Sequence, residues 1–171
     1  MAILAHDEII KRIDKGIIKI EPFNIGRVGP ASIDLTLDHK FRIYKNFHNV
    51  LQLDSDKFDT DSYSEPITVK ESIRLQPGQT ILGVTAEKLT LPSNICGWIQ
   101  GRSRFARIGL MVHISSSFIQ PGASNQQVLE IFNAGPISIK LYSGIAICQI
   151  ILEETLGKAS YTGNFQGQTK P

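Results

Sequence analysis

Short apolar segments separated by tight turns recur along most of this chain, and this pattern constrains the fold more than any other feature. Residues 32–37 and 137–141 alternate apolar and polar side chains, which is typical of half-buried strands. Residues 146–152 are apolar almost throughout, as in a strand covered on both faces. Turns that each contain one proline are predicted at 76–79 and 91–94. Many short strands with few helices predict a mainly β fold, either a barrel or a sandwich.

The other expected elements fit the same fold class. A short N-terminal helix is predicted over 6–15, because Ile9, Ile10 and Ile13 share one helical face and Gly16 can end the helix. Further short strands are expected at 17–20, at 41–44 after a turn at 38–40, and at 72–75, 80–85, 95–100 and 128–132.

Two polar stretches stand outside the strand pattern. Residues 46–66 are rich in Asp and Ser and are predicted to form a long loop with one short strand. Residues 157–171 form a Gly- and Gln-containing tail after a single domain of residues 1–156. The tail is either a disordered end or a lid that orders over a ligand, with Tyr161 and Phe165 as its apolar anchors.

Composition excludes several classes of protein. The chain has 171 residues, 42% hydrophobic and 20% charged, which fits one globular domain with a sizeable core. A net charge of +2 gives no argument for a nucleic-acid partner. No signal peptide or membrane span is visible, and Cys96 and Cys148 lack metal-type spacing. We therefore expect a reduced cytoplasmic protein with no membrane partner, although these two cysteines leave a disulfide open.

A basic segment within residues 97–133 carries the first candidate chemistry. Ser103 can cap a short central helix and Gly109 can end it. Arg102, Arg104 and Arg107 surround that helix, and arginine makes bidentate contacts to phosphate oxygens. The segment is either a phosphate-binding element or a solvated basic turn.

Glu130 is the second candidate, because it lies inside an apolar strand. Along the strand it shares a face with Val128 and Phe132, while Leu129 and Ile131 take the other face. If both faces are covered, burial raises the pKa of Glu130 and suits it to general acid/base catalysis. The alternative is a surface glutamate with apolar neighbours.

Several segments together resemble the dCTP deaminase family. They are the Gly-Arg-Ser-Arg-Phe-Ala-Arg-Ile-Gly-Leu-Met-Val-His run at 101–113, Ile-Gln-Pro-Gly at 119–122, Val-Leu-Glu at 128–130, Val-Gly-Pro-Ala-Ser-Ile-Asp-Leu-Thr-Leu at 28–37 and Phe-Gln-Gly-Gln at 165–168. The resemblance covers nearly the whole chain and is less specific between these deaminases and their dUTPase relatives. It implies a dUTPase-like β-barrel or jelly roll with a short N-terminal and a short central helix.

The resemblance also implies partners and an activity. The chain would form a homotrimer with active sites at subunit interfaces, and it would bind dCTP with Mg²⁺ on the triphosphate. It would convert dCTP to dUTP and ammonia, with dTTP as a candidate inhibitor. Zinc deaminases need an H-x-E and a P-C-x-x-C motif. Here His6-Asp7-Glu8 matches the first by chance and no C-x-x-C exists, so we expect no zinc and no protein-bound catalytic metal.

The family's roles fall on particular residues. Glu130 would be the general acid/base, Ser103 would hold the water and a phosphate, and Arg107 would support the water site across the interface. The substrate-binding set implied by the resemblance is Arg102, Ser103, Arg104, Arg107, Ser116, Gln120, Val128, Leu129, Glu130, Tyr161, Asn164 and Gln168. His113 could be a base, but within the apolar run 110–114 it is interpreted as a packed histidine.

Three departures from the family pattern keep alternatives open. Gln120 stands where the family usually has the Asp that activates water for attack on the α-phosphate in dUTPases. Asn164 replaces a common Lys, and Ser117 replaces a common His. Gln120 argues against the first alternative, a dUTP diphosphatase or bifunctional enzyme. All three changes leave open a non-catalytic pyrimidine nucleotide-binding homologue.

Overall fold

The structure, a computed structural model, describes residues 2–45, 50–51 and 59–171. The helical elements are α1 (His6–Asp14), η1 (Ile25–Arg27), α2 (Thr60–Tyr63) and α3 (Ser103–Ala106). The strands are β1 (Lys19–Glu21), β2 (Ile33–Tyr44), β3 (Ser64–Thr68), β4 (Ser72–Leu75), β5 (Thr80–Thr90), β6 (Ile95–Gly101), β7 (Leu110–Val112), β8 (Phe118–Ile119), β9 (Ser124–Asn133), β10 (Ile139–Tyr142) and β11 (Ala146–Glu154).

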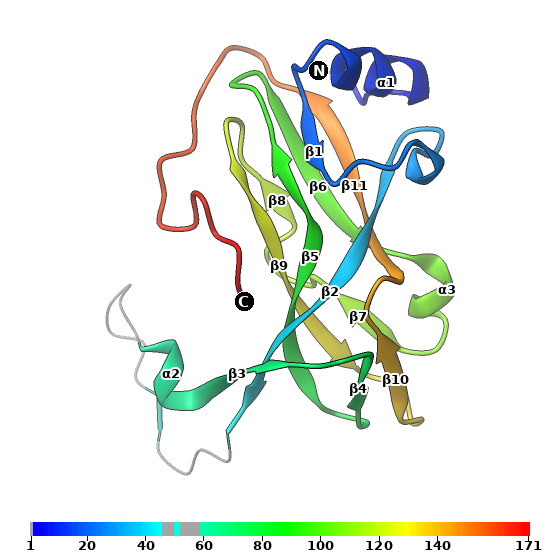
Figure 1. The fold of residues 1–171 in the computed structure, drawn as a ribbon, viewed down its shortest axis with the longest axis vertical. Coiled ribbons are helices and arrows are strands. Elements are labelled where there is room, and N and C mark those ends of the chain that lie inside the picture. Colours follow the sequence, from blue (N-terminus) through cyan, green and yellow to red (C-terminus); the bar gives the residue numbers. More distant parts are fainter. Residues whose placement is uncertain (1, 46–49, 52–58) are drawn as a thin grey trace.

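Most of the described strands form one curled antiparallel sheet. Its order is β7-β9-β5-β2-β11-β6-β8, with β1 added beside β5 and β3 beside β2. A separate β4–β10 pair lies at one end, and α1 lies at the other (Figure 1). The mainly β prediction is confirmed, with a short N-terminal helix and a short central helix as expected.

The core fills the inside of this curl. Strand β9 alternates strictly, so Leu129 and Ile131 are fully buried while Glu130 is half-buried on the outer face. Neighbouring strands contribute Phe41 and Ile81, both with no exposed surface. Buried apolar area of this kind is the main favourable term in folding. The inner face of this strand is covered as predicted, whereas the outer face, which carries Glu130, is only partly covered.

Two local predictions differ from the structure. The turn expected at 38–40 is absent, because β2 runs through it as one 12-residue strand. Its pairing with β5 shifts register between Leu37 and Phe41, so the polar triplet marks an irregularity inside a strand. In the loop predicted for 46–66, the described part holds α2 and the start of β3, while 46–49 and 52–58 lie outside the described residues.

The central helix begins one residue earlier than predicted. Arg102 is the N-cap residue of α3 and makes no side-chain cap, whereas Ser103 is the first helical residue. The prediction that Ser103 caps the helix is therefore wrong. Gly109 has φ +82 and lies three residues beyond α3, where its carbonyl accepts from the N–H of Ala134 at 2.8 Å.

The cysteines and the helices bear on the remaining expectations. Cys96 and Cys148 are both free and buried, so they do not form the disulfide that the sequence left open. None of the helices in the described ranges has the length and apolar character needed to cross a membrane.

Replacing Gly109 with Ala should destabilise the protein far more than the same change at Gly144. Both glycines have φ +82, so both variants carry the backbone cost, about 1 kcal/mol in the free energy of unfolding. A Cβ on Gly109 would also lie 2.5 Å from Cα of Gly135, while one on Gly144 meets nothing within 4 Å. Urea unfolding should therefore show an additional loss of about 1–3 kcal/mol for Gly109→Ala. Equal losses would contradict this packing.

Candidate active site

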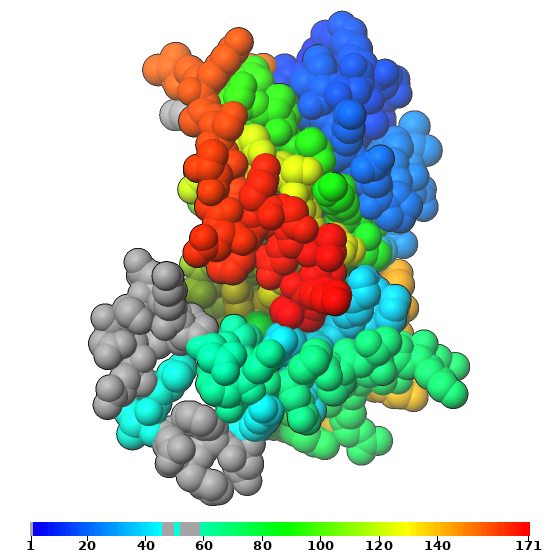
Figure 2. Space-filling model, turned by 60° about the vertical axis from the view of Figure 1, so that its left-hand side comes forward, coloured from blue at the N-terminus to red at the C-terminus, as the bar shows by residue number. Residues whose placement is uncertain are grey.

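A pocket of about 540 Å³ opens on the outer face of the sheet. It is lined by β9, the 113–120 segment, Leu82 of β5, part of α2 and the C-terminal tail. In Figure 2 the red tail crosses this face beside the teal and green band of α2 and β3. Glu130 is the one acidic residue among the described residues that line the pocket, which also include no Lys or Arg. The pocket therefore offers a carboxylate and neutral polar groups.

Strand register sets the direction of Glu130. It pairs with Leu82 of β5, and Arg42 of β2 is the next residue in the same cross-strand row. Directly paired residues point to the same face of a sheet, so all three side chains lie on the outer face. On the other side of β9, the N–H of His113 donates to the carbonyl of Glu130 at 2.7 Å.

The ring of His113 lies against the Glu130 carboxylate. Its Nδ1 is 3.0 Å from Oε2 of Glu130, in a close polar contact without good hydrogen-bond alignment. His113 is 8% exposed and has φ 56, an uncommon conformation for a residue other than glycine. The predicted packing of this histidine is confirmed. Its contact with Glu130 was missed, because the local sequence gives no sign that β7 pairs with β9.

The net pKa shift of Glu130 is opposite to the predicted one. Burial, the largest single influence, raises the pKa of Glu130, but the His113 interactions and a backbone N–H lower it and together prevail. The expectation of a raised pKa was wrong because it counted burial without this histidine. Glu130 is therefore ionised at neutral pH and can accept a proton at once, as a general base must.

Six of the twelve residues in the predicted substrate-binding set do lie together. The pocket is lined by Ser116, Gln120, Val128, Glu130, Tyr161 and Gln168. Leu129 differs, because its side chain is 0% exposed in the core and only its backbone remains available. Asn164 is exposed and does not line the pocket.

The four residues of the basic segment lie elsewhere in this chain. None of them lines the pocket, and α3 stands on the opposite side of the ribbon from the tail (Figure 1). Arg102 is held by the chain itself, since its Nη2 is 2.9 Å from Oδ2 of Asp34 and its Nη1 donates to the carbonyl of Ala146. Ser103, Arg104 and Arg107 are exposed. One chain therefore does not bring Ser103 and Arg107 to Glu130.

The C-terminal tail lies along the first part of β9. The N–H of Gly167 donates to the carbonyl of Ser124 at 2.9 Å, and the N–H of Gln126 donates to the carbonyl of Gln168 at 2.9 Å. The tail thereby brings Tyr161, Phe165 and Gln168 to the lining of the pocket. Ordering on a ligand stays a prediction.

No group of three or more His, Cys, Asp or Glu side chains is placed to hold a metal ion anywhere in the described ranges. The chemistry that the pocket itself offers is acid/base chemistry at one carboxylate, with amides and hydroxyls around it. An outward-facing carboxylate in a pocket of this kind can serve as the general base for hydrolysis of a small molecule.

The chain belongs to the dCTP deaminase-like family, whose family model matches residues 3–155. A "dCTP deaminase, dUMP-forming" from Nocardioides sp. is 35% identical, covering 99% of this chain and 92% of that protein. A "dCTP deaminase" from Marinomonas sp. is 38% identical, covering 98% and 91%. The family assignment made from the sequence is thereby confirmed.

A solved structure shares the fold. The 2′-deoxycytidine 5′-triphosphate deaminase from Agrobacterium tumefaciens superposes with a TM-score of 0.67 at 21% identity. The match covers 88% of this chain and 47% of that chain, so the present chain spans about half of that larger protein.

Replacing His113 with Asn should raise the pKa of Glu130 above its ordinary range. Asn tolerates a positive φ, so the backbone can stay in place while the interactions of the His113 ring are lost and burial prevails. The carboxyl titration of Glu130, followed by carbon NMR, measures the change. An unchanged midpoint would show that His113 does not set the pKa of Glu130.

Replacing Gly122 with Ala should release the tail. A Cβ on Gly122 would lie 2.9 Å from Cα of Ser160, and the backbone has φ +75. Limited proteolysis should then cut residues 157–171 several times faster than in the parent protein. Gly144→Ala, which has a similar φ and no neighbour within 4 Å, is the matched control and should leave the cutting rate unchanged. Equal cutting of both variants and the parent would contradict the docked tail.

Proposed function

We propose that this protein is a dCTP deaminase that hydrolyses the C4 amino group of the cytosine base. The observation that carries the proposal is Glu130, an ionised, half-buried carboxylate facing a lined pocket in a chain of this family. Because the relatives are named for dCTP, the substrate class follows from them and the catalytic role from this side chain.

Glu130 would act twice on protons. Its carboxylate takes a proton from the attacking water as the water oxygen bonds to C4, and it passes that proton to N3. Glu130 then takes the proton of the new C4 hydroxyl and gives it to the amino group, so that the C4–N bond breaks, ammonia leaves and C4 becomes a carbonyl. His113 favours the ionised carboxylate between these steps, since its ring lies 3.0 Å away.

The phosphate end of the substrate needs groups that the pocket of one chain lacks. The proposal therefore includes a homotrimer, in which α3 of a neighbouring subunit supplies the exposed Ser103, Arg104 and Arg107. It also includes Mg²⁺ arriving on the triphosphate as part of the substrate, because Mg²⁺ bound to phosphates needs few protein ligands. A cytoplasmic location and inhibition by dTTP belong to the same proposal.

The product is a second question, and one observation favours a different answer from the one that the sequence suggested. The Nocardioides relative is named as dUMP-forming, which implies that it also cleaves the triphosphate. Gln120 favours dUTP as the product, because its neutral amide in the pocket cannot serve as the base for cleavage of the triphosphate. The second candidate function is therefore a bifunctional deaminase and diphosphatase that releases dUMP.

Product analysis tests both. We expect the protein with Mg²⁺ to release ammonia from dCTP, and Glu130→Gln to lose at least about 100-fold in turnover while still binding dCTP, because Gln cannot move the proton. Ion-exchange separation of nucleotides with ammonia and pyrophosphate assays gives the answer. Full activity of Glu130→Gln would overturn the mechanism, and dCTP binding with no ammonia would favour a non-catalytic homologue. Pyrophosphate together with dUMP would establish the bifunctional enzyme and a base other than Gln120.

A further inference from the structure

Helix α2 forms a wall of the Glu130 pocket that the family motifs did not point to. Thr60 and Tyr63 of α2 line the pocket together with Glu130 and Leu82. Neither residue stands out in the sequence, because residues 46–66 are predicted to form a long polar loop with one short strand. The segments that resemble the family, at 101–113, 119–122 and 128–130, do not include α2 either.

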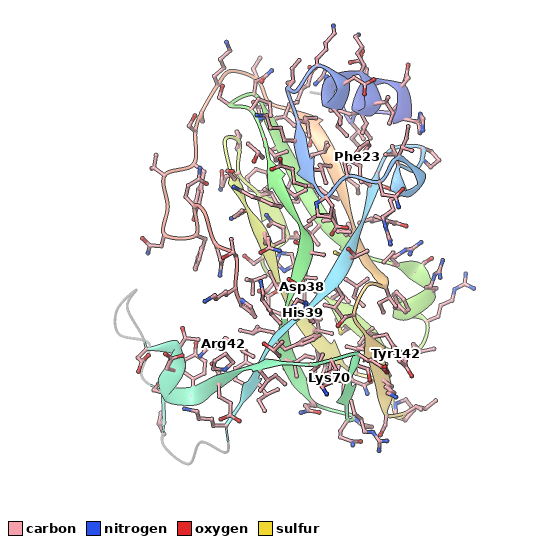
Figure 3. The ribbon with its side chains drawn as sticks, in the orientation of Figure 1. Phe23, Asp38, His39, Arg42, Lys70 and Tyr142 are labelled. Atoms are coloured by element: carbon pink, nitrogen blue, oxygen red, sulfur yellow. The ribbon has the colours of Figure 1, made fainter. Side chains whose placement is uncertain are left out.

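A buried arginine ties this wall to the sheet. Arg42 is 9% exposed and lies in the same cross-strand row as Leu82 and Glu130. Its Nε donates to Oγ of Ser64 at 2.9 Å, its Nη2 donates to the carbonyl of Ser64 at 3.2 Å, and its guanidinium pairs with the carboxylate of Asp61. Figure 3 places Arg42 between β2 and α2. With four residues, α2 is too short to be stable as an isolated helix. Charge-assisted contacts from the rigid guanidinium of Arg42 therefore fix its orientation.

Tyr63 stacks on a second tyrosine at the wall of the pocket. The rings of Tyr44 and Tyr63 are 6.1 Å apart between centroids and inclined by 16°. The pKa of Tyr44 is raised by burial, then by Tyr63 and by the charge of Glu130, so this pair lies within electrostatic reach of the Glu130 end of the pocket. Tyr44 therefore supports the ring of Tyr63, which lines the pocket.

We propose that Tyr63 packs against the pyrimidine base of the substrate and that Arg42, with Asp61, is the positioning pair that holds Tyr63 there. The inference rests on the proposed function for the identity of the base. An aromatic face beside the reacting end of the pocket is the group that stacks on a nucleobase whatever its hydrogen-bonding pattern. A contact of this kind acts on the bound substrate and on the transition state alike, so it lowers KM and leaves kcat nearly unchanged.

The first test compares Tyr63→Ala, Tyr63→Phe and the control Tyr142→Ala. Tyr142 is an exposed tyrosine on β10, on the opposite side of the molecule from Arg42 in Figure 3. We expect Tyr63→Ala to raise KM for dCTP about tenfold with little change in kcat, Tyr63→Phe to stay near the parent, and Tyr142→Ala to match it. Unchanged KM in Tyr63→Ala would overturn the proposal.

The second test asks whether the positioning pair acts through Tyr63. Asp61 has a side chain that is 75% exposed, so Asp61→Ala should loosen α2 with little loss in melting temperature. It should raise KM, and the double variant with Tyr63→Ala should be no worse than Tyr63→Ala alone. Additive effects would mean that the Arg42–Asp61 pair only stabilises the fold and would overturn its positioning role.

Binding measurements keep this inference separate from the proposed function. Calorimetry of dCTP with Glu130→Gln, with and without Tyr63→Ala, needs no turnover. If the parent protein releases no ammonia but Tyr63→Ala still weakens binding about tenfold, only the proposed activity fails. If turnover is present and the affinity is unchanged, only the role of Tyr63 fails.

Discussion

The pairing of β9 between β5 and β7 is the constraint on which the rest of the site depends. It gives strict alternation, so Leu129 and Ile131 enter the core and Glu130 faces outward. A slip of one residue would reverse every side chain and bury the carboxylate among aliphatic groups. The large cost of burying an unpaired charge therefore reinforces the register that the apolar core already selects.

The same pairing determines the charge state of the carboxylate. Because β7 ends beside Glu130, the next residue, His113, is brought within 3.0 Å of the carboxylate. Burial alone would favour the protonated acid, and the neighbouring ring reverses the balance. A base that is ionised before the substrate arrives can activate water directly. The half-buried position also limits how much bulk water can screen it.

Sequence reasoning succeeded where one strand or one motif carries the information. The alternation at 128–132 predicted the strand and the isolated glutamate, and the motif segments identified the family. It failed where the answer depends on strands far apart in the chain. The contact of His113 with Glu130 needs the β7–β9 register, and the wall formed by α2 needs Arg42 on a strand about twenty residues away. The prediction of a turn at 38–40 was wrong because consecutive polar residues inside a long strand resemble a turn when only the local sequence is considered.

The carboxylate of the pocket and the exposed cations of the basic segment lie on different surfaces of the chain. The described pocket lining contains one carboxylate and no Lys or Arg, whereas the exposed cations Arg104 and Arg107 lie on and just after α3. A triphosphate carries several negative charges and cannot be held tightly by amides alone. In the proposed homotrimer, α3 of a neighbouring subunit would bring these cations to the pocket. Assembly and substrate affinity would then be coupled, and a dissociated chain would keep Glu130 yet lose its hold on the phosphates.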